Sequence, residues 1–557
     1  MSIFTRISAF FMSLIVSFGG LFQFFRPQVP QAKSEAELMQ LENCFEKHEI
    51  SDTLYVVDPS HIKSSEYDAL RCLQGLANKE KAQIFIANCW MARQFLKQLE
   101  SKGITLCYND KSGNPWNLKS LIEKFKDCIS DSGYVLYRYS EFAEGYNTAC
   151  NYATVKGWLA ISAEMQSFAD ECGLKMMKDI SQEEYDYKFL EKFFDEYKDN
   201  FSDAGIVHIK ASSAGLRDFA IQQKMFICYT DPSRNGERFL KKVLNGIGES
   251  GLVMGWCENE KTFVKFISKL GFAISPSDHS YNLSVMNGFD SDFTVPARQE
   301  KITPDPNKHY VALIYSDGDN IQWMTNGFNE FYRHLALQRD YPVTWGFPCM
   351  CESVCPAVTK EIYSVADENT SFIAGPSGIG YALPSAFEDK SMDAYTTETA
   401  AAMLKSGMRV ATILDDEPSA IKTAAFARKF DYYSRFDNID GGIIFLDPRM
   451  YGAGEGRVWF SNDKPFLTVR KTLWSTDGYD GITEQWMAEQ AEEINSYKAD
   501  INSINGYSAI CIHAWSLTPE NLPKLLAMLD EHIELVSAEQ LIEMITENVP
   551  HNYAKPE

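Results

Sequence analysis

The feature that most constrains the fold is a series of short apolar runs in the C-terminal half of the chain. Polar or helical sequence separates each run from the next. Near-continuous apolar runs of this kind are typical of parallel strands that are buried on both faces. The eight predicted strands are Tyr310–Ser316, Pro342–Pro348, Ser371–Gly375, Arg409–Leu414, Gly442–Leu446, Phe466–Arg470, Ser508–His513 and Ile533–Val536.

The spacing of these runs predicts a closed barrel. About 250 residues with roughly eight strand–helix repeats are typical of a (β/α)8 barrel. A seven-stranded variant fits the same spacing equally well. The predicted fold class is therefore α/β, with a C-terminal (β/α)7–8 barrel-like domain.

The N-terminal half also alternates between strands and helices, but its elements are shorter. Predicted strands at Thr53–Asp58 and Gln83–Asn88 alternate with predicted helices at Ser65–Ala77 and Met91–Glu100. The pattern restarts near residues 133 and 205, which predicts two or three small α/β units. The polar stretch 301–308 contains Pro304 and Pro306 and is the best linker. The predicted division is 1–32 (export or anchor segment), 33–140 (α/β unit), 141–204 (connecting helical or α/β unit), 205–300 (third α/β unit) and 306–557 (barrel).

The first residues resemble an export segment. Arg6 precedes a long apolar run, Ile7–Phe25, which Arg26 and Pro27 end. This pattern predicts either a signal peptide or an uncleaved N-terminal anchor. An apolar helix of the fold itself is the alternative. We therefore expect an extracytoplasmic protein that contacts a membrane only through such an anchor.

The charge of the chain narrows the class of partner. The formal net charge is −23 at pH 7, with a sequence pI near 4.9. Binding to nucleic acid needs a basic face, so a nucleic-acid partner is not expected. Anionic lipid headgroups are disfavoured for the same reason. A neutral polymer such as a polysaccharide is compatible with this charge.

Most of the 13 cysteines stand alone between apolar neighbours, which is typical of free buried thiols. Cys349, Cys351 and Cys355 are the exception, because they lie close together. A structural metal site would need a second cysteine or histidine cluster, and the sequence contains no such partner. No metal and no cofactor are therefore predicted.

Polar and aromatic side chains follow the predicted strands at the same phase of each repeat. In parallel barrels the residues just beyond the carboxyl ends of the strands build the site. Each has a structural alternative, since an Asp at such a junction often caps a helix and a His is often a core residue. The candidates are, in chain order, Asp317, Asp319, Asn320, Trp345, Tyr381, Asp415, Asp416, Glu417, Asp447, Arg470, Trp474, His513 and Trp515.

The segment Gly378–Pro384 reads GIGYALP and closely resembles the motif that names the GxGYxYP family of glycoside hydrolases. Leu383 stands where the motif has its second tyrosine. Ile314–Asn320 is similar to the opening barrel strand of that family, and Met254–Glu260 and Ser277–Ser284 are similar to its N-terminal region. The resemblance implies an N-terminal α/β region followed by a barrel-like domain, in exported proteins of carbohydrate-using bacteria. It also implies a carbohydrate substrate.

Glycoside hydrolysis is the first interpretation of the chemistry. It requires one carboxylic acid to protonate the leaving oxygen and one carboxylate to act as nucleophile or base. We predict Asp319 together with one of Asp415, Asp416 and Glu417 as the catalytic pair. The other residues at the strand ends are expected to bind substrate, namely Asp317, Asn320, Trp345, Tyr381, Asp447, Arg470, Trp474, His513 and Trp515.

Two other functions remain open from the sequence. A metal-dependent polysaccharide deacetylase would need a histidine pair near a carboxylate. His513 alone follows a barrel strand, and no His-x-x-x-His occurs in the chain. A non-catalytic glycan-binding protein would use rings such as Trp345, Tyr381 and Trp474 to hold sugars without an acid–base pair.

Overall fold

The computed structural model describes residues 29–139, 144–316, 320–327, 333–334, 336–416, 424–447 and 450–557. The predicted export segment lies almost wholly outside these residues. Among the residues described, no helix combines the length and the apolar character needed to cross a membrane. Lys33–Glu557 form one compact unit.

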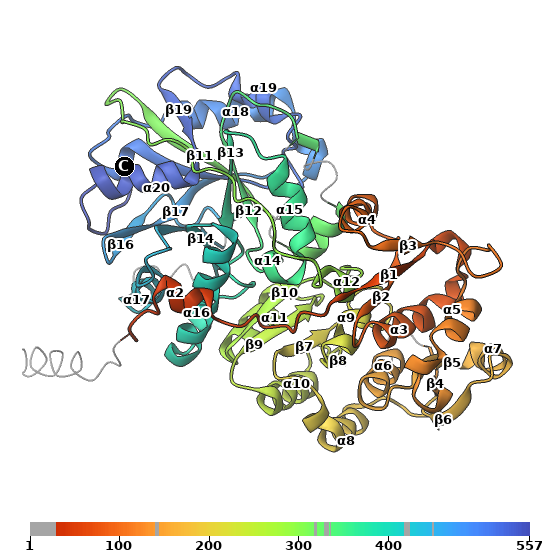
Figure 1. The fold of residues 1–557 in the computed structure, drawn as a ribbon. Coiled ribbons are helices and arrows are strands. Elements are labelled where there is room, and N and C mark those ends of the chain that lie inside the picture. The colour runs from red at the N-terminus through yellow and green to blue at the C-terminus, as the bar shows by residue number, and fades with distance from the viewer. Residues whose placement is uncertain are drawn as a thin grey trace, which may run out of the picture. The chain divides into compact units, whose positions relative to one another are not determined.

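All eight predicted strands of the C-terminal half are present, and seven of them close into a parallel barrel (Figure 1). The closing contact joins β11 to β12, where Ile314 pairs with Thr344 and Tyr315 with Trp345. In order around the barrel the strands are β11 His309–Tyr315, β12 Val343–Phe347, β13 Thr370–Ala374, β14 Val410–Asp415, β15 Gly441–Leu446, β17 Lys464–Leu473 and β18 Tyr507–Ile512.

The eighth predicted strand, β19 Ile533–Val536, does not complete an eight-stranded barrel. It pairs with the first half of β11, at residues 309–312, whereas β12 pairs only with the end of β11. β19 therefore occupies the edge of β11 that the short β12 leaves unpaired. A further strand, β16 Val458–Ser461, forms an antiparallel hairpin with β17. The turn residues Asn462 and Asp463 both have positive φ, as a two-residue hairpin turn of this hand requires.

The interior of the barrel is filled by alternate residues of its strands, because successive side chains point to opposite faces. Ala312 and Ile314 of β11, Leu467 and Val469 of β17 and Cys511 of β18 belong to one buried cluster. The helices of the domain are α14 Cys351–Val354, α15 Pro356–Ser364, α16 Asp389–Ser406, α17 Ala424–Ser434, α18 Glu484–Asn495, α19 Leu522–Leu526 and α20 Ala538–Asn548.

Three small parallel sheets precede the barrel, so the predicted α/β units are confirmed as sheets (Figure 1). Their strand orders are β2-β1-β3, β5-β4-β6 and β10-β9-β7-β8. The strands are β1 Ile50–Val57, β2 Ala82–Ile86, β3 Thr105–Cys107, β4 Gly133–Tyr137, β5 Leu159–Ser162, β6 Lys175–Asp179, β7 Gly205–His208, β8 Phe226–Cys228, β9 Gly251–Gly255 and β10 Phe272–Pro276. Their described helices are α3 Tyr67–Ala77, α4 Ala92–Ser101, α5 Leu118–Lys124, α6 Gly145–Lys156, α7 Gln166–Glu171, α8 Tyr187–Tyr197, α9 Arg217–Gln222, α10 Arg234–Ile247, α11 Glu260–Lys269 and α12 Leu283–Met286. The preceding helix, α2 Glu35–Met39, packs against α16 of the barrel domain.

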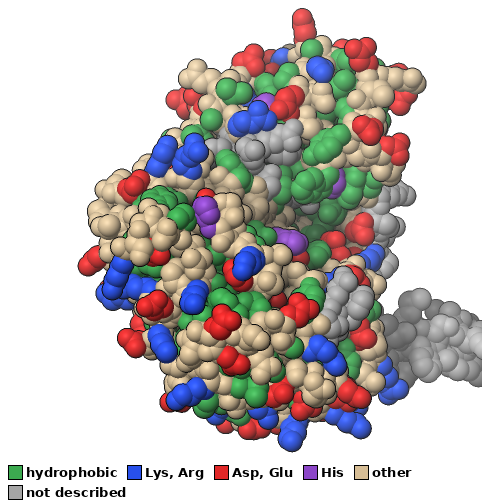
Figure 2. All heavy atoms as spheres, turned by 90° about the vertical axis from the view of Figure 1, so that its right-hand side faces the viewer, with side chains coloured by type: hydrophobic (Ala, Val, Ile, Leu, Met, Phe, Trp, Pro, Cys, Tyr) green, Lys and Arg blue, Asp and Glu red, His purple; other side chains and the backbone are tan. Residues whose placement is uncertain are grey.

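The third sheet meets the barrel through its edge strand β10. The backbones of Ile274 in β10 and Tyr381 in the loop after β13 exchange two hydrogen bonds, of 2.8 and 2.6 Å. In Figure 1 this sheet adjoins the barrel domain, and so does helix α4 of the first sheet, which lies beside α15. The residues coloured in Figure 2 show Lys and Arg interspersed with Asp and Glu, so that face carries no continuous basic surface.

Candidate functional site

A cavity of about 280 Å³ lies at the carboxyl ends of β14, β15 and β17. This is the rim at which the sequence predicts the site. Its outer wall comes from α11, which belongs to the third N-terminal sheet. The described residues that line it are Glu260, Lys261, Val264, Tyr381, Leu383, Leu414, Asp415, Asp416, Asp447, Met450, Tyr451 and Trp474.

Asp415 and Asp416 are adjacent but differ in what they contact. Asp415 is completely buried and accepts hydrogen bonds from the backbone and hydroxyl of Ser385, at 2.8 and 2.7 Å. Burial raises the pKa of the Asp415 carboxyl, and these hydrogen bonds oppose the rise. Asp416 instead pairs with two lysines of α11, Lys265 at 3.5 Å and Lys261 at 3.8 Å. Asp415 therefore anchors the loop that carries Ser385, and Asp416 faces α11.

Asp447 follows β15 and meets the same lysine as Asp416. Its Oδ2 lies 3.4 Å from Lys261 Nζ. Since Oδ2 of Asp416 lies 3.8 Å from the same nitrogen, the two carboxylate oxygens are at most about 7 Å apart. Glycosidases place their two carboxyl groups about 5 Å apart when they retain configuration and roughly 6.5 to 9.5 Å apart when they invert it. This upper limit admits the retaining separation and only the lower end of the inverting range.

The GIGYALP segment positions Tyr381 at the cavity. Gly378 has φ +116°, and a Cβ at that position would lie 2.4 Å from Thr399 Cγ2, so only glycine fits. The Tyr381 hydroxyl donates a 2.9 Å hydrogen bond to Glu260, and its ring stacks on Trp256 at 6.1 Å. The motif therefore joins the barrel to the third sheet and places one ring in the cavity wall.

Three rings from neighbouring strand ends pack together at this rim of the barrel. The Trp474 and His513 rings lie nearly parallel, with centroids 3.6 Å apart. The Tyr451 ring packs against Trp474 at a tilt, with centroids 5.5 Å apart. Trp474 and Tyr451 line the cavity, whereas His513 is buried behind Trp474. His513 thus supports the ring that faces the cavity.

Four other predicted residues do not line this cavity. Trp345 stacks on Tyr315, with centroids 4.7 Å apart, and lines a separate cavity of about 570 Å³ against the segment that leads into α19. The remaining three have contacts of their own: Arg470 lies over the Tyr497 ring at 3.9 Å, the Asn320 side chain accepts from Trp323 N at 2.8 Å, and Trp515 packs edge-on against Trp323 at 5.6 Å and is 45% exposed. Asp317, Asp319 and Glu417 lie outside the described residues.

Sequence reasoning missed the contribution of α11. Glu260 and Lys261 lie in its first turn and reach the cavity from a different sheet. The only signal for them was the resemblance of Met254–Glu260 to the N-terminal region of the family. Nothing in the local pattern shows that this helix faces the barrel, because that contact depends on pairing between residues more than 100 positions apart.

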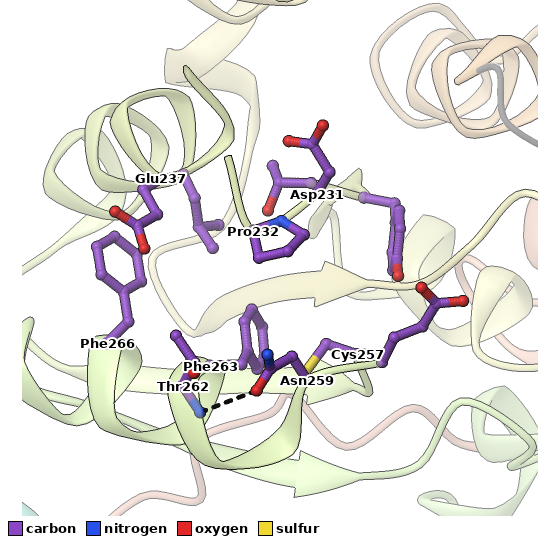
Figure 3. Close-up of a pocket in the computed structure, with 12 residues that line it drawn as sticks. Asp231, Pro232, Glu237, Cys257, Asn259, Thr262, Phe263 and Phe266 are labelled. Carbon is purple, nitrogen blue, oxygen red and sulfur yellow. Dashed lines mark hydrogen bonds between the residues drawn. The ribbon is translucent and has the colours of Figure 1, made fainter. Parts of the chain in front are cut away.

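A smaller cavity, of about 30 Å³, lies at the carboxyl ends of β8 and β9 (Figure 3). Pro232, Phe263 and Phe266 line it, and carboxylates such as Glu237 stand at its edge. A space of this volume holds about one water molecule and is too small for a sugar ring. Among the described residues, no group of three or more His, Cys, Asp or Glu side chains is placed to hold a metal ion.

Comparisons with known proteins agree with the resemblance noted in the sequence. Residues 307–546 match the family model described as "GxGYxYP putative glycoside hydrolase C-terminal domain". Residues 206–288 match its "third domain" and residues 132–199 its "second domain". A search among curated proteins found no match.

One solved structure shares the fold over nearly the whole chain. It is described as a "putative hydrolase from Bacteroides thetaiotaomicron", and it superposes with a TM-score of 0.79 at 24% sequence identity. The match covers 94% of this chain and 99% of the other. Three models of one family thus match the chain in order, and together they span well over half of its length. The chain belongs to the GxGYxYP family.

Proposed function

We propose that the protein hydrolyses glycosidic bonds in the cavity at the barrel mouth. The observation that carries the proposal is the close approach of Asp416 and Asp447 in a cavity that Tyr381, Tyr451 and Trp474 line. Two carboxyl groups at this separation meet the chemical need of the reaction, and rings beside them offer surfaces on which a sugar can stack. Membership of the family supports a carbohydrate substrate.

The roles follow from the contacts of each group. Asp416 pairs with two lysines, so it suits the negatively charged nucleophile or base. Asp447 is 40% exposed at its side chain and suits the acid that meets the leaving group. Asp319, which follows the first barrel strand, remains the alternative to Asp447 as the catalytic partner of Asp416, because the sequence predicts it in that role. We assign Asp415 a structural role, because Ser385 and the Asp416 backbone satisfy its oxygens.

We also infer that the substrate is met outside the cytoplasm. The apolar run Ile7–Phe25 between Arg6 and Arg26 supports export of the chain. The net charge of −23 favours a neutral glycan over a polyanion.

Non-catalytic glycan binding is the second candidate, and one contact favours it. Lys261 pairs with both Asp416 and Asp447. An acid catalyst must contact the leaving oxygen, and in this arrangement Lys261 occupies a contact with each of the two carboxylates. Hydrolysis therefore requires the substrate to displace Lys261 from one of them, whereas binding alone does not.

The test is hydrolysis of a panel of α- and β-linked oligosaccharides, with products separated by chromatography. We expect Asp416→Asn and Asp447→Asn each to lower turnover about 100-fold or more while substrate binding persists, since loss of an acid or base costs about 10² to 10⁴ in rate. Asp530→Asn, at an exposed position outside the cavity, is the matched control. Binding by the unaltered protein without turnover of any bound glycan would contradict hydrolysis and support the second candidate.

A further inference from the structure

Three apolar side chains from different elements are among those that line the cavity at the barrel mouth. They are Val264 of α11, Leu383 of the motif segment and Leu414 of β14. All three are buried, with exposed fractions of 0, 2 and 8%. The carboxylates and Lys261 belong to the same cavity, so a ligand there meets charged groups and the small exposed surfaces of Leu383 and Leu414, with Val264 packed beneath.

Leu383 is the position at which this chain departs from the motif of its own family. The name GxGYxYP places a tyrosine there, and the chain has leucine. The backbone at this point is held in place, since Leu383 N donates to Ser268 Oγ at 3.0 Å. The preceding carbonyl, of Ala382, accepts from Ser377 Oγ at 2.7 Å. Because the backbone is fixed on both sides, the size and polarity of side chain 383 decide the shape of this wall.

A sugar hydroxyl is poorly suited to such a wall. It would lose its hydrogen bonds to water, and Val264, Leu383 and Leu414 offer no side-chain donor or acceptor in return. A methyl group placed there is removed from water at a gain. With tyrosine at position 383, the wall would be both fuller and able to hydrogen-bond a hydroxyl. Leucine at position 383 therefore favours a methyl group on the substrate, whereas tyrosine would favour a hydroxyl group.

We propose that Leu383 is a specificity-determining residue and that the site takes a sugar bearing a methyl-terminated substituent, such as an acetamido group or the methyl of a 6-deoxy sugar. This inference rests on the proposed function, because it assumes that a sugar occupies the cavity. It deepens that function by naming the class of sugar.

Binding of free monosaccharides to the full chain tests the inference without requiring turnover. The probes are N-acetylglucosamine, N-acetylgalactosamine and fucose, compared with glucose and galactose by saturation-transfer NMR and calorimetric titration. We expect the acetyl or 6-deoxy methyl protons to receive the strongest saturation from the protein. We also expect at least one methyl-bearing sugar to bind about 10-fold or more tightly than its plain counterpart, since one methyl in an apolar pocket discriminates by about 10- to 200-fold. Comparing the two N-acetyl sugars with fucose shows whether the preferred methyl belongs to an acetamido group or to a 6-deoxy sugar.

Leu383→Tyr restores the residue of the family motif and should lower the preference for the methyl-bearing sugar about 10-fold. Leu337→Tyr, at a leucine that is 56% exposed and does not line this cavity, should leave the preference unchanged. Leu383→Phe fills the same space without a hydroxyl and separates volume from hydrogen bonding.

Three outcomes would overturn the inference. They are plain sugars that bind as tightly as methyl-bearing ones, a preference that Leu383→Tyr leaves intact in a folded protein, and no binding of any sugar at millimolar concentration. The methyl saturation pattern needs no variant, so it still decides the matter if the variants fail to fold. Hydrolysis of matched disaccharides with and without the substituent is measured separately. Methyl-dependent binding without cleavage would contradict the hydrolase proposal and leave this inference standing.

Discussion

At the scale of single residues, the adjacent carboxylates Asp415 and Asp416 differ in burial and in the groups that they contact. Asp415 is completely buried, and the Ser385 backbone and hydroxyl together with Asp416 N donate to its oxygens. Asp416 is only slightly more exposed, yet its partners are lysines that a ligand can compete for. The same residue type thus serves structure at one position and is available for chemistry at the next.

Glu144 is a buried carboxyl that does not line the cavity at the barrel mouth, and it should make stability depend on pH. Burial raises the pKa of Glu144 to about 7, although Asn147 and Tyr229 N donate to its Oε2. The folded state therefore holds this proton more tightly than the unfolded chain, whose glutamates have a pKa of about 4.3. The resulting stabilisation is full below that value and is lost as pH rises through about 7.

We predict that the free energy of unfolding, measured by chemical denaturation, falls between pH 5 and pH 8. Glu144 should contribute roughly 3 kcal/mol of the change. Glu144→Gln should flatten the profile, because glutamine stays neutral and its oxygen can still accept. Glu352, whose pKa burial also raises to about 7, should retain a slope of the same sign. Glu80→Gln, at an exposed position, is the control, and an unchanged slope in Glu144→Gln would refute the prediction.

At the scale of elements, the loop after β13 connects the barrel to the third sheet through hydrogen bonds to β14 and β10. Ser377 Oγ donates to the Ala382 carbonyl and accepts from Leu414 N, which ties the loop to β14. Tyr381 extends the edge of β10 through two backbone hydrogen bonds. The loop therefore links the barrel to the third sheet, and its glycines are required by close packing on both.

Gly378→Ala should be far more destabilising than an alanine at a glycine with the same sign of φ in open space. Gly378 has φ +116°, and its Cβ would meet Thr399 Cγ2 at 2.4 Å, so both backbone and neighbour must shift. Gly113 has φ +83° with no atom within 4 Å of the added Cβ, so Gly113→Ala costs backbone strain alone. We expect unfolding free energies lower by about 3 kcal/mol or more for Gly378→Ala and about 1 kcal/mol for Gly113→Ala. Equal losses of unfolding free energy in the two variants would contradict the prediction, because they would show that the Thr399 side chain moves away from the added Cβ at little cost.

At the scale of the whole molecule, the third sheet completes the candidate site. Glu260, Lys261 and Val264 of α11 supply one wall, and the barrel supplies the rest. Other contacts reinforce this packing, including Gln98 of α4, which donates to the Ala357 carbonyl and to Glu361 of α15. The N-terminal sheets therefore act as part of the site and its support.

The thirteen cysteines are a second property of the whole molecule, and all of them are free thiols in the structure. We predict that thirteen thiols react in the unfolded protein, whether or not a reductant is present during purification. In the folded protein the partly exposed ones should be alkylated before the buried ones, as read by mass spectrometry. The partly exposed ones are Cys44, Cys107, Cys128, Cys172 and Cys257. Fewer than thirteen reactive thiols without reductant would reveal a disulfide and contradict the prediction.

The sequence by itself determined the barrel and the location of its rim. Apolar runs mark strands buried on both faces, and parallel strands in a closed barrel bring their carboxyl ends to one side. Asp416, Asp447, Tyr381 and Trp474 were predicted on that basis and line one cavity. The motif also led to the family, because its glycines and tyrosine are unusual in combination.

Only the tertiary structure decided which side of a strand each side chain faces and what covers the rim. Trp345 pairs with Tyr315, which faces the side of β11 opposite to Ile314 and the core. The Trp345 side chain therefore does not line the cavity at the barrel mouth. Arg470 lies at a β-bulge in β17, because Val469 pairs with Ala509 and Lys471 with the next residue, Ile510. The extra residue moves the side chains that follow to the opposite face of the strand. Closure with seven strands depends on how far β12 and β19 each pair along β11. The α11 wall depends on a contact between distant segments, and local periodicity carries no information about such contacts.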